Sequence, residues 1–254
     1  MTLEFLGTGT SQGIPVIGCS CLVCTSPNSE DKRNRCAALI SDHGTALLID
    51  SGPDIRAQLL RAKVSHLDAV LITHEHYDHT GGLDDLRPIG FNSDGIQLYA
   101  RANVLEQIKI KYDYAFGEQK YPGAPKFKLH ILEGMEELTL GNISVRPLPV
   151  QHGNLSILGY CFNDLLMYIT DANGLPEQTL KSIQNIDTLV INALHHTPHH
   201  SHFTLAETLE TIEKINPRQT YIIHVSHHMG LHHEVSHMLP EQVFLAYDTL
   251  KIEI

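Results

Sequence analysis

The amino-acid sequence predicts a mixed α/β protein that forms one domain over residues 1–254. Short apolar runs typical of buried strands recur along the whole chain, and helix signals follow several of them. With 254 residues, 42% of them hydrophobic, the chain is long enough to enclose a full core. Turn sequences between residues 127 and 170, namely Gly141-Asn142 and Asn163-Asp164, predict a series of antiparallel hairpins within this framework.

The first third of the chain is predicted to hold four strands and one helix. The first strand runs into a glycine-rich turn at residues 7–15, whose small residues would let backbone N–H groups approach a ligand. The predicted strands cover residues 3–6, 36–40, 46–50 and 68–72, and the helix covers residues 54–63.

The second half of the chain alternates strands first with turns and then with helices. Thr204 begins the last predicted helix, and Glu207 lies at the spacing of a capping box. Strands are predicted at residues 127–132, 136–140, 143–149, 157–162, 165–170, 188–192 and from residue 221, and helices at residues 176–185 and 204–215.

Most of the 18 histidines lie in three clusters, and the densest directly follows the fourth predicted strand. Side chains alternate along an extended chain, so His74 and His76 face the same side. Asp78 and His79 belong to the following turn and can face a second point. The spacing therefore predicts one loop that holds two metal ions side by side, with a histidine-rich surface loop as the alternative.

Single polar residues at later strand ends supply what a two-metal site still lacks. His152 and Asp171 each follow an apolar strand and would add an imidazole and a bridging carboxylate, and His224 ends the last of these strands. Residues 195–202 contain five more histidines, which exceed the open ligand positions, so some must be solvated or act on protons. Asp50, at another strand end, is expected either to orient a ligand histidine or to cap a turn.

Three thiols, those of Cys19, Cys21 and Cys24, lie within six residues. Such a group suits one tetrahedral zinc with a fourth ligand from elsewhere, and His227 is predicted to provide it. Incidental thiols are the alternative. The remaining cysteines, Cys36 and Cys161, are predicted to be core thiols because their strands are apolar. Four late histidines are predicted to lie on the surface, namely His228, His232, His233 and His237.

The formal charge of −11 argues against a general affinity for nucleic acid or membrane surfaces. The chain start lacks signal-peptide features and no apolar run approaches a membrane span, so a cytoplasmic location is expected. The segment 92–128 differs from the rest, with six basic and four acidic side chains interleaved with aromatic residues, among them Tyr112, Tyr114, Phe116, Tyr121 and Phe127. It is predicted to be a lid or a substrate-recognition insertion, with an ordinary helix and loop as the alternative.

The ligand pattern resembles the metallo-β-lactamase superfamily. The matching residues follow in the same chain order, namely His74, His76, Asp78, His79, His152, Asp171 and His224. The resemblance implies an αββα four-layer sandwich of two mixed β-sheets with helices on the outer faces. The opening sequence from Leu6 to Pro15 and the cysteine trio with His227 are similar to the PhnP-type phosphoribosyl cyclic phosphodiesterases.

For the site, the resemblance implies manganese or zinc at a catalytic pair and one structural zinc at the cysteines. It implies His74, His76 and His152 on the first metal, Asp78, His79 and His224 on the second, and Asp171 between them. His202 matches the general acid, although His199 and His200 lie close enough to leave that assignment open. The resemblance also favours a homodimer.

The expected function is hydrolysis of a small phosphodiester, such as a cyclic ribose phosphate, by a hydroxide shared between two metals. A transfer-RNA 3′-end endonuclease is an alternative, but that activity needs a basic surface for phosphate contacts. A thioester or lactone hydrolase would use the same metals on a carbonyl group. A non-catalytic metal-binding protein is the alternative outside the enzymes.

Overall fold

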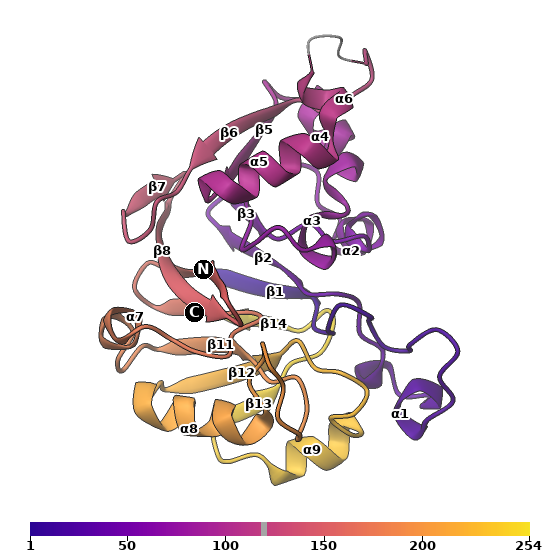
Figure 1. Ribbon diagram of the computed structural model, residues 1–254, viewed down its shortest axis with the longest axis vertical. Coiled ribbons are helices and arrows are strands. Elements are labelled where there is room, and N and C mark those ends of the chain that lie inside the picture. Colours follow the sequence, from indigo (N-terminus) through magenta and orange to yellow (C-terminus); the bar gives the residue numbers. More distant parts are fainter. Residues whose placement is uncertain (118–120) are drawn as a thin grey trace.

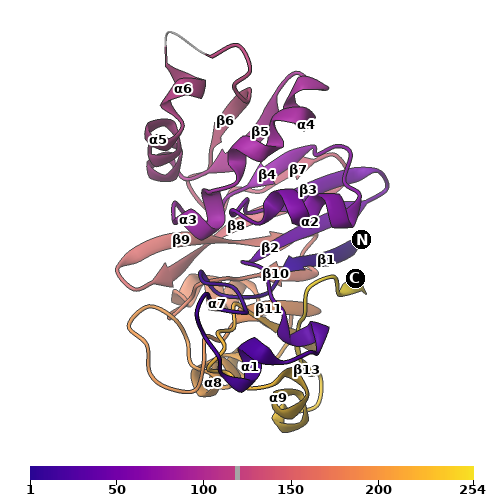
Figure 2. The same cartoon turned by 90° about the vertical axis from the view of Figure 1, so that its right-hand side faces the viewer.

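The computed structural model describes residues 1–117 and 121–254, and within these ranges two seven-stranded sheets pack face to face (Figures 1 and 2). In spatial order the first sheet contains β14 (Lys251–Glu253), β1 (Thr2–Gly7), β2 (Ala37–Asp42), β3 (Thr45–Ile49), β4 (Ala69–Leu71), β5 (Ile96–Ala100) and β6 (Phe127–Ile131). The second contains β13 (Val243–Leu245), β12 (Gln219–Ile223), β11 (Thr188–Asn192), β10 (Leu166–Tyr168), β9 (Leu155–Phe162), β8 (Ile143–His152) and β7 (Leu138–Leu140).

The helices lie on the two outer faces, which gives the four layers that the sequence predicts (Figure 1). The helices on the outer side of the first sheet are α2 (Ile55–Ala62), α3 (Tyr77–Thr80), η2 (Leu83–Leu86), α4 (Arg87–Phe91), α5 (Ala102–Lys111) and α6 (Asp113–Phe116). The second sheet carries α7 (Glu177–Ser182), α8 (Leu205–Ile215) and α9 (His232–Met238), while α1 (Leu22–Thr25) and η1 (Ser29–Asp31) belong to the loop after β1. None of the described helices has the length and apolar character that a membrane crossing requires.

The main core lies between the sheets and consists of apolar side chains that both sheets direct inward. Phe5 and Ile49 of the first sheet belong to the same buried cluster as Tyr160, Phe162 and Val190 of the second. Such large side chains, removed from water, each contribute on the order of 1.5–3 kcal/mol to the stability of the fold. The core therefore fixes the two sheets to each other and gives the strand ends a rigid base.

Local signals account for the best-predicted elements. In α8, the Thr204 hydroxyl accepts a hydrogen bond from Glu207 N, and the Glu207 carboxylate accepts one from Thr204 N. This is the predicted capping box. The hairpins β7–β8 and β9–β10 also form, at the predicted turns Gly141-Asn142 and Asn163-Asp164.

One part of the predicted hairpin series is wrong. The strand predicted at residues 127–132 does not pair with its successor but lies parallel to β5 at the edge of the first sheet. Both ends of the segment 92–128 are thus sheet strands, and α5 between them packs on the first sheet. Residues 118–120 of that segment lie outside the described residues. A lid or recognition role for the remainder stays a prediction.

Candidate metal centre

Strand ends carry most of the candidate ligands, whereas Asp78 and His79 lie in α3, and three residues at or after strand ends have an unusual backbone. Asp50 after β3, Asp171 after β10 and His224 after β12 have φ angles of 60°, 58° and 55°. This left-handed conformation is uncommon for residues other than glycine, although Asp, Asn and His adopt it more readily than most. The chain turns sharply at each of these residues, which lie in the buried space where the two sheets meet.

Asp50 anchors the start of the loop that follows β4. Its carboxylate accepts hydrogen bonds from Thr73 N at 2.8 Å and from the Thr73 hydroxyl at 2.9 Å. A close backbone contact holds the loop from the side, because a Cβ atom on Gly52 would lie only 2.0 Å from Asp78 O. Only glycine permits this approach, so the sequence Ser51-Gly52 is part of what places Asp78.

The first group of ligand atoms comes from His74, His76 and His152, which lie within 4.8 Å of one another. His74 Nε2 and His76 Nδ1 are 2.9 Å apart. Two of these rings use Nδ1 for another contact: His152 Nδ1 donates to Ser201 O at 2.9 Å, and His74 Nδ1 contacts the Thr73 hydroxyl. The Nε2 atoms of His152 and His74 are therefore the ones available to a metal. Contacts of this kind fix the orientation and tautomer of metal-binding histidines.

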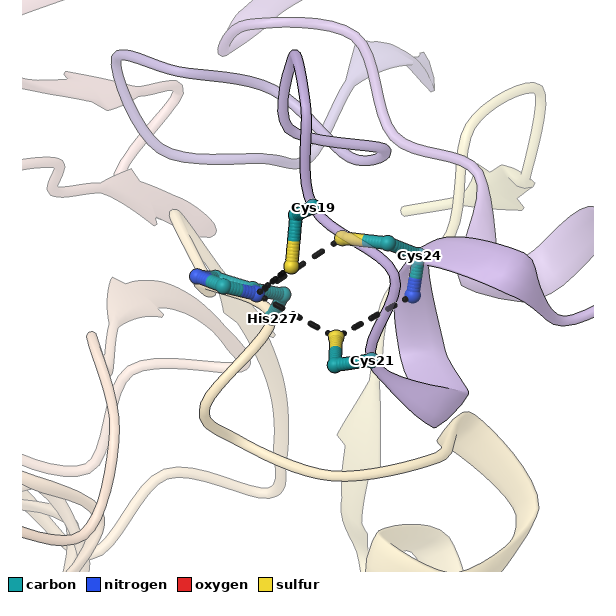
Figure 3. A group of neighbouring side chains, drawn as sticks. All are labelled: Cys19, Cys21, Cys24 and His227. Carbon is teal, nitrogen blue, oxygen red and sulfur yellow. Dashed lines mark hydrogen bonds between the residues drawn. The ribbon is translucent and has the colours of Figure 1, made fainter.

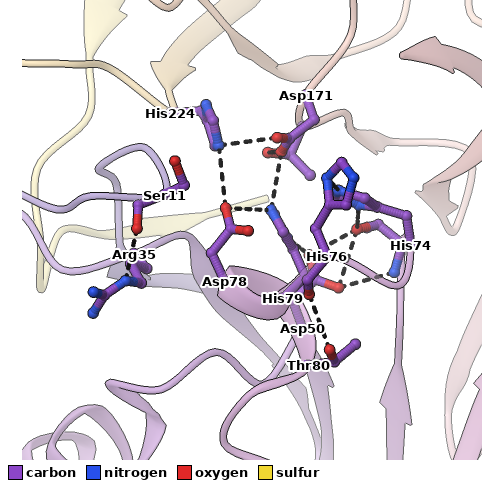
Figure 4. A network of polar contacts seen from close by, with 12 residues as sticks. Ser11, Arg35, Asp50, His74, His76, Asp78, His79, Thr80, Asp171 and His224 are labelled. Atoms are coloured by element: carbon purple, nitrogen blue, oxygen red, sulfur yellow. Dashed lines mark hydrogen bonds and ion pairs between the residues drawn. The ribbon is translucent and has the colours of Figure 1, made fainter. Parts of the chain in front are cut away.

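The second group consists of Asp78, His79, Asp171 and His224 (Figure 4). His79 Nε2 lies 3.1 Å from Asp78 Oδ2 and 3.2 Å from Asp171 Oδ2, and His224 Nε2 lies 3.0 Å from Asp171 Oδ1. His79 Nδ1 donates to Asp50 Oδ2 at 2.7 Å, which is the orienting contact expected of Asp50.

Both groups fit divalent cations. Ligand bonds of about 2.1 Å at tetrahedral angles separate ligand atoms by about 3.4 Å, close to the distances in the second group. Among the described residues, the buried atoms His79 Nε2 and His224 Nε2 have no hydrogen bond of acceptable geometry, although carboxylates lie beside them. The atoms thus point at a common centre rather than at each other, as ligands of one ion do.

Charge in the second group is strongly coupled. Burial opposes charge on His224, but Asp171 and Asp78 outweigh it and raise its pKa to about 9. Burial likewise opposes charge on Asp171, but His224 and His79 hold the pKa of this carboxyl well below its usual range. A cation that binds here would displace the proton of His224, so its affinity would fall as the pH is lowered.

His202 is placed beside both groups. It forms a third cluster with His152 and Asp171, and its Nδ1 lies 3.8 Å from Asp171 Oδ1. Its ring centroid is 4.9 Å from those of His152 and His224. His199 is the next ring outward, 5.0 Å from His202, while the side chain of His200 is exposed. Of the three candidate acids, His202 therefore lies nearest the ligands.

A separate group brings together Cys19, Cys21, Cys24 and His227 (Figure 3). The three sulfur atoms lie 3.4, 3.3 and 3.6 Å from His227 Nδ1. A hydrogen bond from Cys24 N, aided by His227, lowers the pKa of Cys21 to about 6, so this thiol ionises near neutral pH. Thiolate sulfur is the form that binds zinc, and the set matches a tetrahedral Cys₃His site.

Replacing Cys21 with serine is expected to remove one equivalent of zinc and to lower the melting temperature by about 5–10 °C, because a structural zinc contributes directly to folding. Metal analysis and thermal unfolding of the variant measure both effects. Cys161→Ala is the control, since this buried thiol lies outside the cluster. Unchanged zinc content in Cys21→Ser would contradict the assignment.

The structure adds residues that the sequence did not single out. Thr73 joins Asp50 to His74, and the Asn173 side chain links His152's turn to the loop of His202. No local pattern marks either residue. One late histidine predicted on the surface is buried: His232 lies in α9, with Nδ1 3.1 Å from Nη2 of the buried Arg33. The predicted core thiols, Cys36 and Cys161, are both buried.

Known proteins share this architecture. Residues 45–225, which include every candidate ligand of the two catalytic groups, match the Beta-lactamase superfamily domain. A solved structure described as a diphosphatase from the PhnP family is 35% identical, with a TM-score of 0.92 over 100% of this chain and 97% of that one. The chain belongs to the metallo-β-lactamase superfamily, in its PhnP branch. The predicted family and four-layer fold are thereby confirmed.

Other similar proteins carry different names. A protein of Porphyromonas gingivalis named Octanoyltransferase is 40% identical over 253 residues, which are 99% of this chain but 51% of that protein. Ribonuclease Z of Bradyrhizobium diazoefficiens is 28% identical over 63% of this chain and 49% of its own. The PhnP-family chain therefore spans about half the length of the curated relatives it matches. Zn²⁺-bound PqqB from Methylobacterium extorquens shares the fold, with a TM-score of 0.81 at 18% identity over both full chains.

Proposed function

We propose that this PhnP-family protein is a binuclear metal-dependent phosphodiesterase that hydrolyses small phosphodiesters, with cyclic ribose phosphates as the preferred class. The observation that supports this most directly is the position of Asp171. Its Oδ2 lies 3.2 Å from His79 Nε2 of the second group, and the same carboxylate lies within 4.8 Å of His152 of the first. A carboxylate that reaches both groups can bridge two cations.

Each residue then has a defined task. His74, His76 and His152 would hold one cation, Asp78, His79 and His224 would hold the other, and Asp171 would contact both. When bound, two manganese or zinc ions would lower the pKa of a shared water and neutralise charge that develops on the phosphoryl oxygens. His202 would give a proton to the leaving alkoxide.

The relatives support hydrolysis at phosphorus. The similar PhnP-family structure is described as a diphosphatase, and Ribonuclease Z is named for cleavage of RNA. Large RNA is the less suitable substrate for this chain, because a formal charge of −11 opposes the phosphate contacts that such a substrate requires. A small diester needs no extended binding surface.

A second candidate is hydrolysis of a thioester, which is favoured by one observation. The similar protein of Porphyromonas gingivalis is named for transfer of an octanoyl group, so acyl chemistry occurs in a protein with a related domain. The same cations could polarise a carbonyl group. The match spans half of that protein, however, and does not assign its activity to either part.

A substrate panel separates the candidates. The purified protein is analysed for metal and then assayed with bis-p-nitrophenyl phosphate, a ribose cyclic phosphate, an octanoyl thioester and a precursor transfer RNA. We expect the cyclic phosphate to give the highest kcat/KM, with activity lost in chelator and restored by manganese or zinc. Faster turnover of the thioester or of the RNA would replace the proposal, and turnover by metal-free protein would refute it.

A further inference from the structure

We infer that Asn173 is a positioning residue for the reaction, because its side chain fixes the segment 200–203 that carries His202. This inference rests on the proposed function, in which His202 protonates the leaving group. Asn173 lies two residues after Asp171 and is half-buried beside the turn that follows β8. It is not a candidate ligand, so any effect on the chemistry has to pass through its neighbours.

Both the oxygen and the nitrogen of the Asn173 side-chain amide form hydrogen bonds. Oδ1 accepts a hydrogen bond from Gly153 N at 2.9 Å, and Nδ2 donates to His200 O at 3.0 Å. Asn173 N also donates to Gln151 O at 2.9 Å. One side chain thus joins three loops, which carry His152, Asp171 and His202.

The segment around His202 has further anchors on either side. Ser201 O accepts from His152 Nδ1 at 2.9 Å, and Phe203 N donates to Ala172 O at 2.7 Å. With the Asn173 contact to His200 O, the residues before and after His202 are all held against the loops of the ligands. The His202 Nδ1 atom has no hydrogen-bond partner of its own among the described residues. Its position therefore depends on these backbone anchors and on the neighbouring rings of His152, His224 and His199.

Gly153 strengthens the connection. Its φ is 57°, and a Cβ atom there would lie 3.3 Å from Ser201 Cβ, so the turn after β8 packs directly on the segment of His202. The Asn173 side chain closes the gap between these two backbones. Loss of the amide would free the N-terminal side of the segment while leaving the metal-facing atoms of His152 and Asp171 in place.

A proton donor acts only within hydrogen-bond reach of the leaving oxygen, and a displacement of about 1 Å can cost on the order of 100-fold in rate. The cost appears where protonation of the leaving group matters. Alkyl phosphodiesters have poor leaving groups and need the proton, whereas p-nitrophenyl esters do not. Asn173 should therefore control the dependence of rate on the leaving group rather than the rate of all substrates.

Three variants test this. Asn173→Ala removes both contacts. Asn173→Asp keeps an acceptor for Gly153 N but loses the donor to His200 O. Gln151→Ala is the matched control, because the exposed Gln151 side chain contacts Gly153 O in the same turn and does not reach the segment of His202. Each variant is assayed with a p-nitrophenyl and an alkyl phosphodiester, and amide hydrogen exchange of residues 199–203 is measured in parallel.

We expect both Asn173 variants to lose on the order of 10–100-fold in kcat with the alkyl ester, as for other residues that orient a functional group, and at most about threefold with the p-nitrophenyl ester. Metal content should be unchanged, and exchange of residues 199–203 should be faster than in wild type or Gln151→Ala. In a His202→Ala background, Asn173→Ala should add nothing, since two residues that act as a unit are not additive.

Equal losses with both esters, additive losses with His202→Ala, or an Asn173→Asp variant with wild-type rates would each overturn the inference. Amide hydrogen exchange reports on the protein without substrate and therefore tests the structural part of the inference by itself. Unchanged exchange of residues 199–203 in both Asn173 variants would also overturn the inference. A protein that hydrolyses neither ester in its wild-type form refutes the proposed function instead, which keeps the two failures distinct.

Discussion

Asp171→Asn is expected to reduce phosphodiester turnover by at least about a thousandfold while the fold stays intact. Loss of residues that merely orient a ligand costs 10–100-fold, and a bridging carboxylate contacts both cations itself, so the loss should be larger. Asp171→Ala should show the same loss. Activity with saturating manganese or zinc, metal content, and circular dichroism measure the effect.

Comparing Asp171→Asn with Asp171→Ala separates the loss of the bridging carboxylate from the effect of backbone strain on stability. Asp171 has a φ of 58°, which asparagine tolerates and alanine accepts only with strain. Asp171→Asn should therefore unfold at nearly the wild-type temperature, and Asp171→Ala at a lower one, although both are inactive. An active Asp171→Asn variant with two bound cations would contradict the bridging role.

His202→Ala is expected to lower kcat by about 10²–10⁴-fold for alkyl phosphodiesters and by far less for p-nitrophenyl esters, the pattern of a lost general acid. Without bound cations or substrate, burial and the neighbouring His224 lower the pKa of His202 to about 3. Its imidazole is then neutral, and the negative charge of a bound phosphate is what would raise the pKa enough for His202 to carry the proton.

The pH profile provides an independent check on this role. An acid must be protonated to act, so kcat for the alkyl ester should fall as the pH rises through the pKa of His202 in the substrate complex. His202→Ala should lack this limb. His200→Ala serves as the control, because the His200 side chain is exposed and its contact to Asn173 uses only the backbone. Equal losses for both esters in His202→Ala would exclude it as the acid.

Several candidate ligands could be found in the sequence because they stand at or near the end of an apolar run, namely His74, His152, Asp171 and His224. The end of a buried strand is a rigid position, and a polar residue there is conspicuous in the sequence. Alternation predicts that His74 and His76 share one side, and the turn that follows carries Asp78 and His79 to a second point; the two pairs lie in separate groups in the structure. Local pattern and position in the fold agree at these residues.

Other features depend on contacts between distant segments and leave no local signal. Residues 96–100 alternate buried and half-buried as β5, but the charged and glycine-rich surroundings conceal the strand. The strands β13 and β14 have three residues each, too few for a periodic pattern. His232 is buried because it meets Arg33, which lies 199 positions earlier in the chain. Asn173 gains its significance in the same way, from His200 and Gly153.

One stretch of chain carries a candidate ligand for each of the two kinds of metal site. His224 faces the second catalytic group and His227, three residues later, faces the cysteines. Zinc at the cysteines would fix the position of His227, three residues from His224, so that binding at one site would restrain the backbone that carries a candidate ligand of the other. Affinities linked in this way must influence each other reciprocally. Under limited metal supply, we therefore expect the catalytic pair to fill more readily in molecules that already hold zinc at the cysteines.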